Sequence, residues 1–96
     1  MRHHDDVPRA LLHGIIVEYQ ARSYHELARH LGQDDVRTVR GPDGREYQIE
    51  IEAIWDDQPG GAIRVVGAID DGSFRPGLPL SEDFLAMPEG KFISES

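Results

Sequence analysis

The sequence predicts an α+β protein in which two N-terminal helices pack on one face of a four-stranded antiparallel meander sheet. A short C-terminal tail follows, for which the sequence predicts a helical turn and allows an extra strand. Apolar residues recur at helical spacing in the first third of the chain, and they alternate with polar residues from Glu46 onward. Glycine-rich turn sequences separate the alternating runs. The length of 96 residues fits a single domain, residues 1–96.

The first helix is expected to start near Pro8, with Asp5 or Asp6 as its N-cap, because proline is tolerated in a first helical turn. Its apolar stripe consists of Leu11, Leu12, Ile15, Ile16 and Tyr19. Gly14 interrupts this helix, and we expect it to permit close approach to the sheet. A second helix is expected from Ser23, which forms a capping box with Glu26, to Gly32.

The strand register can be predicted from the turns. Val36–Arg40 and Arg45–Trp55 bracket the turn sequence of residues 41–44, which predicts a hairpin. A loop closed with Asp56 opposite Ala62 then aligns the next run. This register pairs Trp55 with Ile63, Ala53 with Val65, Ile51 with Gly67 and Ile49 with Ile69.

The pair Asp71-Gly72 predicts a two-residue hairpin turn that leads into a fourth strand over Ser73–Leu80. Pro76 and Pro79 place that strand at an edge of the sheet or make it short and bulged, because proline has no N–H to donate. The turn sets Phe74 opposite Ile69, Leu78 opposite Val65 and Leu80 opposite Ile63. The expected buried face is Ile49, Ile51, Trp55, Ile63, Val65, Ile69, Phe74, Leu78 and Leu80. Ser81–Met87 is expected to form the helical turn, and Lys91–Ile93 the extra strand.

The formal net charge of −8 lies entirely in the second half of the chain. Residues 1–45 hold seven acidic residues and seven arginines, whereas residues 46–96 hold eleven acidic and three basic residues. A field of this sign repels nucleic acid and anionic membranes and attracts basic proteins. The absence of cysteine excludes disulfides and thiolate metal sites. We expect a cytoplasmic protein without cofactor or metal.

The second face of the sheet is the candidate partner-binding surface. In the predicted register it carries Glu50, Glu52, Ile54, Arg64, Val66 and Arg75. An exposed apolar patch surrounded by charge is typical of an interface, either with a basic protein or with a second copy of the chain. The alternative is that the C-terminal tail covers this face through Phe84, Leu85, Met87 and Phe92.

Residues 23–32, SYHELARHLG, resemble the leading helix of bacterial helix-turn-helix regulators, in which a Glu-Leu-Ala core and a Leu-Gly ending recur. The resemblance implies DNA binding, with Arg37, Arg40 and Arg45 as phosphate contacts. Such a regulator would need a recognition helix between Asp34 and Arg40, where Val-Arg-Thr-Val-Arg favours a strand instead. DNA binding is therefore the alternative function.

Catalytic and metal-binding patterns are weak. His25 and His30 are five residues apart, so they do not share a helix face as the two histidines of a zinc-protease motif do. We expect both to face solvent, and we expect the acidic pairs at residues 34–35, 56–57, 70–71 and 82–83 to lie in turns. His13 and Glu18 could form an acid/base pair, so a small-ligand-binding enzyme is a further alternative. The favoured hypothesis is a non-catalytic protein-interaction module, of the kind represented by acidic immunity or antitoxin-type proteins.

Overall fold

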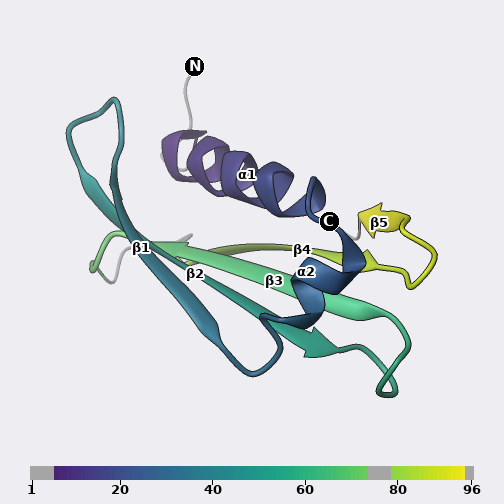
Figure 1. Ribbon diagram of the computed structural model, residues 1–96. Coiled ribbons are helices and arrows are strands. Elements are labelled where there is room, and N and C mark those ends of the chain that lie inside the picture. The colour runs from purple at the N-terminus through teal and green to yellow at the C-terminus, as the bar shows by residue number, and fades with distance from the viewer. Residues whose placement is uncertain (1–5, 74–78, 95–96) are drawn as a thin grey trace.

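The computed structural model describes residues 6–73 and 79–94. Within these ranges the chain forms two helices and five strands. They are α1 (Asp6–Gln20), α2 (Tyr24–Ala28), β1 (Asp34–Arg40), β2 (Glu46–Trp55), β3 (Ile63–Asp70), β4 (Leu80–Ala86) and β5 (Phe92–Ser94). The strands form one antiparallel sheet in the order β1-β2-β3-β4-β5, and both helices lie on the same face of it (Figure 1). The predicted α+β class is confirmed, with one strand more than the four expected.

Helix α1 crosses the sheet at a glycine of β3, not at its own glycine. Leu12, Ile16 and Tyr19 are buried beneath α1, as the apolar stripe predicts. A Cβ added to Gly67 would lie 3.0 Å from Leu12 Cδ1 and 3.1 Å from Ile16 Cδ1, so a larger side chain there would separate helix and sheet. The close approach expected at Gly14 is wrong, because Gly14 is exposed with no heavy atom within 4 Å of its added Cβ.

Gly14→Ala should therefore stabilise the protein. Glycine in an exposed helix interior costs about 1 kcal/mol relative to alanine, and the added methyl group meets nothing. We expect the free energy of unfolding, measured by urea denaturation, to rise by about 1 kcal/mol. Gly67→Ala is the matched control and should lower it, because its methyl group enters the packed core. A destabilised Gly14→Ala variant would contradict the exposed position of Gly14.

Helix α2 begins as predicted and ends early. Ser23 Oγ accepts from the backbone N–H of Glu26 at 3.1 Å, and the Glu26 carboxylate accepts from the Ser23 N–H at 3.0 Å. This capping box is confirmed. The helix stops at Ala28 instead of continuing to Gly32, because Leu31 already bridges to Ala53 in the sheet.

The predicted pairing of β2 with β3 is confirmed at all four positions, from Trp55 opposite Ile63 to Ile49 opposite Ile69. The loop closes as expected, since the Asp56 N–H donates to the Ala62 carbonyl at 2.9 Å. The β1–β2 hairpin also forms around residues 41–44. Its tip curves toward the first turn of α1, where an added Cβ at Gly41 would lie 2.9 Å from Val7 (Figure 1).

The predicted fourth strand is wrong. The strand that pairs with β3 is Leu80–Ala86, and it places Leu80, not Phe74, opposite Ile69. Phe84 takes the predicted position of Leu78 opposite Val65, and Ala86 lies opposite Ile63. Asp71 Oδ1 accepts from the Ser73 N–H at 3.0 Å, so this carboxylate caps a local turn and β4 does not start at Ser73. Phe74, Arg75, Pro76 and Leu78 lie outside the described residues.

The segment predicted as a helical turn is therefore strand β4. Its Ser81-Glu82-Asp83 start resembles a helix cap with an acidic first turn, but pairing along β3 buries Phe84 and Ala86. The short strand expected over Lys91–Ile93 is confirmed as β5. The tail thus extends the sheet and does not fold over it.

The core lies between α1 and the sheet. Its buried members are Leu12, Ile16, Tyr19, Leu27, Tyr47, Ile49, Ile51, Ala53, Ile63, Val65, Ile69, Phe84 and Ala86. The predicted residues Trp55 and Leu80 are partly buried against this cluster. Phe74 and Leu78 lie outside the described residues, and Phe84 supplies an aromatic ring that the sequence pattern did not place there.

Candidate functional site

The sheet face opposite α1, here called the open face, carries the predicted partner-binding residues. Strand alternation puts Glu50, Glu52 and Ile54 of β2 on it, beside Arg64 and Val66 of β3. The register brings them together, with Glu52 opposite Val66 and Ile54 opposite Arg64. The sixth predicted residue, Arg75, lies outside the described residues.

Residues 79–94 of the tail continue the sheet beyond β3 with strands β4 and β5 and do not fold over the open face. Phe84, one of the residues expected to cover it, is buried on the α1 side of the sheet. Apolar side chains on the open face stay accessible: Val36 is 53% exposed, Ile54 41% and Ile93 50%. The helices and the tail of the described chain thus leave this face unpartnered.

Some members of the open face were missed by the sequence interpretation, among them two on β1. Asp34 and Val36 project from β1, opposite Glu52 and Glu50 respectively. The hairpin register set by residues 41–44 could have placed them there, but Asp34 was assigned to a turn. They extend the surface by one strand.

Acidic groups on this face are crowded together. Asp34 shares a hydrogen bond with Glu50, and this contact, the Asp34 charge, burial and the Glu52 charge together raise the pKa of Glu50. Arg64, the arginine of this face that the structure describes, is engaged elsewhere: it binds Asp56 at 2.8 Å and also Asp83. Among the described residues, no lysine or arginine forms an ion pair with Asp34, Glu50 or Glu52. The acidic group therefore repels itself in the isolated protein.

Glu50→Gln should raise the melting temperature at neutral pH. A pKa that is raised on folding means that Glu50 opposes folding once it ionises, so its contribution to stability falls as the pH rises through the raised value. Glutamine cannot ionise and avoids this loss. Calorimetry at pH 7 and pH 4 should show a gain at the higher pH that shrinks at the lower. Asp57→Asn, in an exposed loop, is the control and should change neither value.

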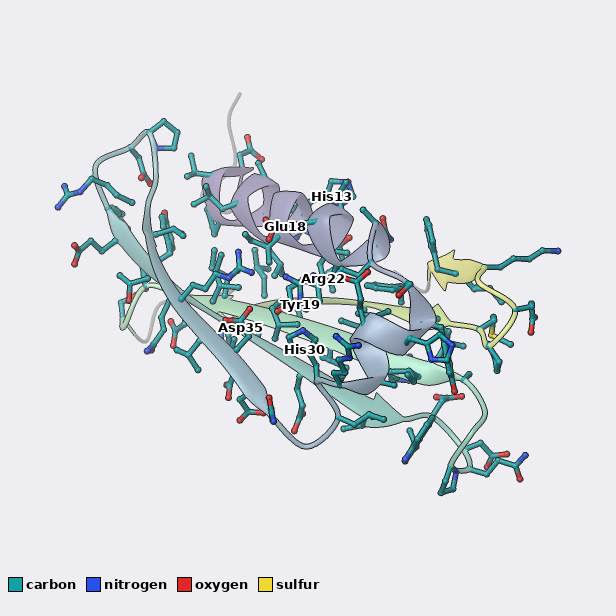
Figure 2. All side chains as sticks on the ribbon, in the orientation of Figure 1. His13, Glu18, Tyr19, Arg22, His30 and Asp35 are labelled. Atoms are coloured by element: carbon teal, nitrogen blue, oxygen red, sulfur yellow. The ribbon has the colours of Figure 1, made fainter. Side chains whose placement is uncertain are left out.

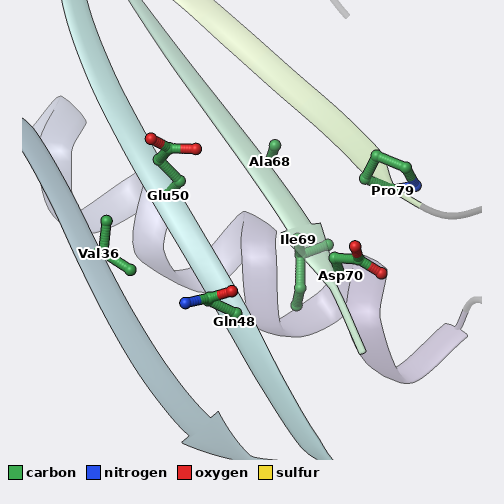
Figure 3. Close-up of a pocket in the computed structure, with 7 residues that line it drawn as sticks. All are labelled: Val36, Gln48, Glu50, Ala68, Ile69, Asp70 and Pro79. Atoms are coloured by element: carbon green, nitrogen blue, oxygen red, sulfur yellow. The ribbon is translucent and has the colours of Figure 1, made fainter. Parts of the chain in front are cut away.

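A depression lies on the open face above Ala68 (Figure 3). It measures about 360 Å³ and is lined by Val36, Gln48, Glu50, Ala68, Ile69, Asp70 and Pro79. The depression exists because Ala68 has a small side chain and its neighbours have longer ones. Glu50 lies directly opposite Ala68, and the pair Gln48 and Asp70 comes next on the same face. The depression combines an apolar floor with acidic sides.

A second polar cluster joins α1 to β1 on the helix side of the sheet (Figure 2). The Tyr19 hydroxyl donates to Asp35, and Arg37 donates to Asp35 at 3.1 Å and to Glu18 at 3.2 Å. Burial and the Asp35 contact raise the pKa of Tyr19, and the same hydrogen bond, followed by Arg37, lowers the pKa of Asp35. These groups satisfy one another, so the cluster ties α1, which packs over β3 and β4, to the edge strand β1.

Arg22 and His30 close the same cluster. The Arg22 guanidinium lies 4.1 Å from the centre of the Tyr19 ring, and its Nη1 is 2.8 Å from His30 Nε2. His30 also contacts the Tyr19 ring edge-on. The expectation that His30 faces solvent is wrong, because the chain leaves α2 before this residue and turns it toward α1.

The predicted acid/base pair is not brought together. His13 Nδ1 lies 2.8 Å from Glu82 Oε2 of β4, whereas Glu18 pairs with Arg37. His25 is exposed beside the Tyr24 ring. Across residues 6–73 and 79–94, no group of three or more His, Asp or Glu side chains could hold a metal ion.

The segment after α2 does not form a recognition helix. Residues 34–40 are strand β1, which leaves α2 without the second helix of a helix-turn-helix motif. The arginines assigned to phosphate contact face carboxylates instead. Arg37 binds Asp35 and Glu18. Arg40 Nη2 lies 3.6 Å from Glu46 Oε2. Arg45 Nη1 lies 3.4 Å from Asp71 Oδ2.

The acidic pairs divide between turns and strands. Residues 56–57 lie in a loop as expected, and Asp70 Oδ1 accepts from the Gly72 N–H at 3.2 Å in a local turn. Residues 34–35 and 82–83 are in β1 and β4, so their assignment to turns is wrong. Each of those two pairs places one carboxylate on either face of the sheet.

No protein-family model, curated protein or solved structure matches this chain. The described residues include no helix with the length and apolar character needed to cross a bilayer. Function must therefore be argued from the open face and the charges on it.

Proposed function

We propose that this protein is a non-catalytic interaction module whose open face docks on a basic protein. The accessible apolar side chains around Ile54 and Val66 carry this proposal, together with the neighbouring carboxylates of Asp34, Glu50 and Glu52, which form no ion pair with a described lysine or arginine. Apolar contacts of this kind supply affinity, and the charged rim supplies orientation and encounter rate. The net charge of −8 steers a cationic partner toward the protein.

A basic partner fits this face better than a second copy of the chain. A two-fold dimer whose axis passes near Asp34, Glu50 and Glu52 would bring this acidic group toward its own copy. Like charges brought together in an interface cost several kcal/mol, roughly, unless cations intervene. A basic surface instead offsets the negative charge of Asp34 and Glu52, which adds to the Asp34 hydrogen bond in raising the pKa of Glu50. Acidic immunity and antitoxin-type proteins use this kind of charge complementarity.

The test is a comparison of two variants with identical charge changes. Val66→Arg places a long cation in the centre of the open face, and Val17→Arg places it on the exposed side of α1, where Val17 is 47% exposed. Partners captured from cells would be purified, and their affinity measured by surface plasmon resonance. We expect a basic partner whose affinity falls at least about 30-fold with Val66→Arg, the loss typical of an interface hot spot.

Val17→Arg should leave that affinity within about twofold, and added salt should mainly slow association. Equal binding by Val66→Arg and wild type would contradict the proposal. So would the absence of any captured protein, or light scattering that shows the wild type to be a dimer and Val66→Arg a monomer.

A further inference from the structure

We infer that the depression above Ala68 receives the side chain of an arginine presented by the partner. This inference rests on the proposed docking of the open face and identifies where and by which chemistry the partner is anchored. The depression measures about 360 Å³. Small-molecule sites span roughly 300–1,000 Å³, so its size suits one long side chain better than a large ligand.

The lining provides both ends of such a side chain with suitable contacts. Ala68 and Val36 form an apolar floor against which the methylene stem can lie (Figure 3). Glu50 stands on β2 directly opposite Ala68, and Asp70 is two residues along β3 on the same face. Residues in that diagonal relation have positions roughly 7–8 Å apart, so their carboxylates flank the depression.

Arginine fits this arrangement better than lysine. Its planar guanidinium presents five N–H donors in a fixed fork, which can bond two separate carboxylates at once. Gln48 also lines the depression, opposite Asp70, and its amide oxygen offers a third acceptor. A lysine ammonium is a compact, strongly hydrated charge and cannot span both carboxylates as well.

Among residues 6–73 and 79–94, no cation is paired with the carboxylates that line the depression. Arg64, the nearest arginine on the open face of β3, is held by Asp56 and Asp83. In the described ranges no arginine or lysine forms an ion pair with Glu50 or Asp70. An incoming guanidinium would also offset the negative charge that Asp34 and Glu52 exert on Glu50. Arginine is among the residues most enriched at interface hot spots, where it fills central pockets.

The test uses a short blocked peptide, acetyl-Gly-Arg-Gly-amide, so it does not depend on finding the natural partner. NMR titration should shift the Ala68 methyl and Glu50 side-chain signals saturably. The citrulline peptide, which is uncharged but similar in shape, should bind at least about tenfold more weakly, and the lysine peptide should be intermediate. Binding should also weaken as the pH falls through the raised pKa of Glu50.

Variants of the depression should remove the response. Ala68→Leu fills the space and Glu50→Gln removes one carboxylate, and each should weaken the arginine peptide at least about tenfold. Asp57→Asn removes a charge in the exposed loop and is the matched control. Circular dichroism would establish that Ala68→Leu folds, and Glu50→Gln tests the site independently of that result.

Equal binding of the arginine and citrulline peptides, or unchanged binding by both variants, would overturn the inference. Spermidine binding at Ala68 that the arginine peptide cannot displace would point to a free polyamine and would also overturn it. If a basic partner binds the open face while the peptide does not enter the depression, the inference fails and the proposed function stands.

Discussion

Phe84→Ala should lower the free energy of unfolding by about 3–5 kcal/mol, the usual cost of removing a buried aromatic ring. Phe84 is fully buried, lies opposite Val65 and packs edge-on against Phe92 with ring centroids 5.8 Å apart. Alanine would leave a cavity beneath α1. Urea denaturation followed by circular dichroism and by the fluorescence of Trp55 measures the loss.

Phe92→Ala is the matched control on the neighbouring strand. Phe92 is 47% exposed, so its truncation loses mainly the aromatic pair, worth about 0.5–1.5 kcal/mol. Domains of this kind have only about 5–15 kcal/mol of stability, and Phe84→Ala can leave a partly unfolded population. Phe84→Leu, with a loss of about 1.5 kcal/mol, keeps the comparison measurable. Equal, small losses for Phe84→Ala and Phe92→Ala would contradict the placement of Phe84 in the core.

Phe84 belongs to β4, the strand that the sequence interpretation placed at the wrong residues. The register of β2 with β3 could be predicted because a short loop joins two long alternating runs, and a slip of one residue would expose every apolar side chain. The connection after Asp70 gave no such constraint. Its Asp-Gly pair matches a two-residue hairpin, but the Asp70 and Asp71 carboxylates bond the backbone two residues ahead and form a different local turn.

The open face followed from the same register, so its central residues were predicted together. Glu52 opposite Val66 requires only the β2–β3 alignment. Its extent was not predicted, because the sequence could not decide whether Phe84 belonged over the face or under it. That choice depends on β4 pairing along β3, a contact between segments separated by the longest connection in the sheet.

The cluster around Tyr19 was not predicted at all. Tyr19 fits an apolar helix stripe, and Asp35 was assigned to a turn, so neither pattern suggested that they meet. Their contact depends on how α1 lies over β3 and β4, so that its side chains reach β1, and local spacing does not encode that. Inward-facing charges such as Asp35 and Arg37 on β1 also serve an edge strand, because they discourage pairing with other chains.

Asp35→Ala should lower the free energy of unfolding at pH 7 by about 2–3 kcal/mol, because the buried Tyr19 hydroxyl loses its acceptor. Arg37 keeps only Glu18 as an ion-pair partner among the described residues. Urea denaturation of wild type and variant measures the difference. Asp57→Ala removes the same carboxyl group from an exposed loop and should stay within about 0.5 kcal/mol of wild type.

The pH dependence of this loss in stability shows whether it comes from the ionised carboxylate of Asp35 or only from the presence of a side chain at that position. Its pKa is lowered on folding by the Tyr19 hydrogen bond first and by Arg37 as well, so the stabilisation is complete above the ordinary aspartate value. It is lost as the pH falls through the lowered value. The difference between wild type and Asp35→Ala should therefore be constant from pH 7 to about pH 5 and shrink in strong acid. If the difference stays constant into strong acid, the ionised carboxylate of Asp35 does not stabilise the contact between α1 and β1.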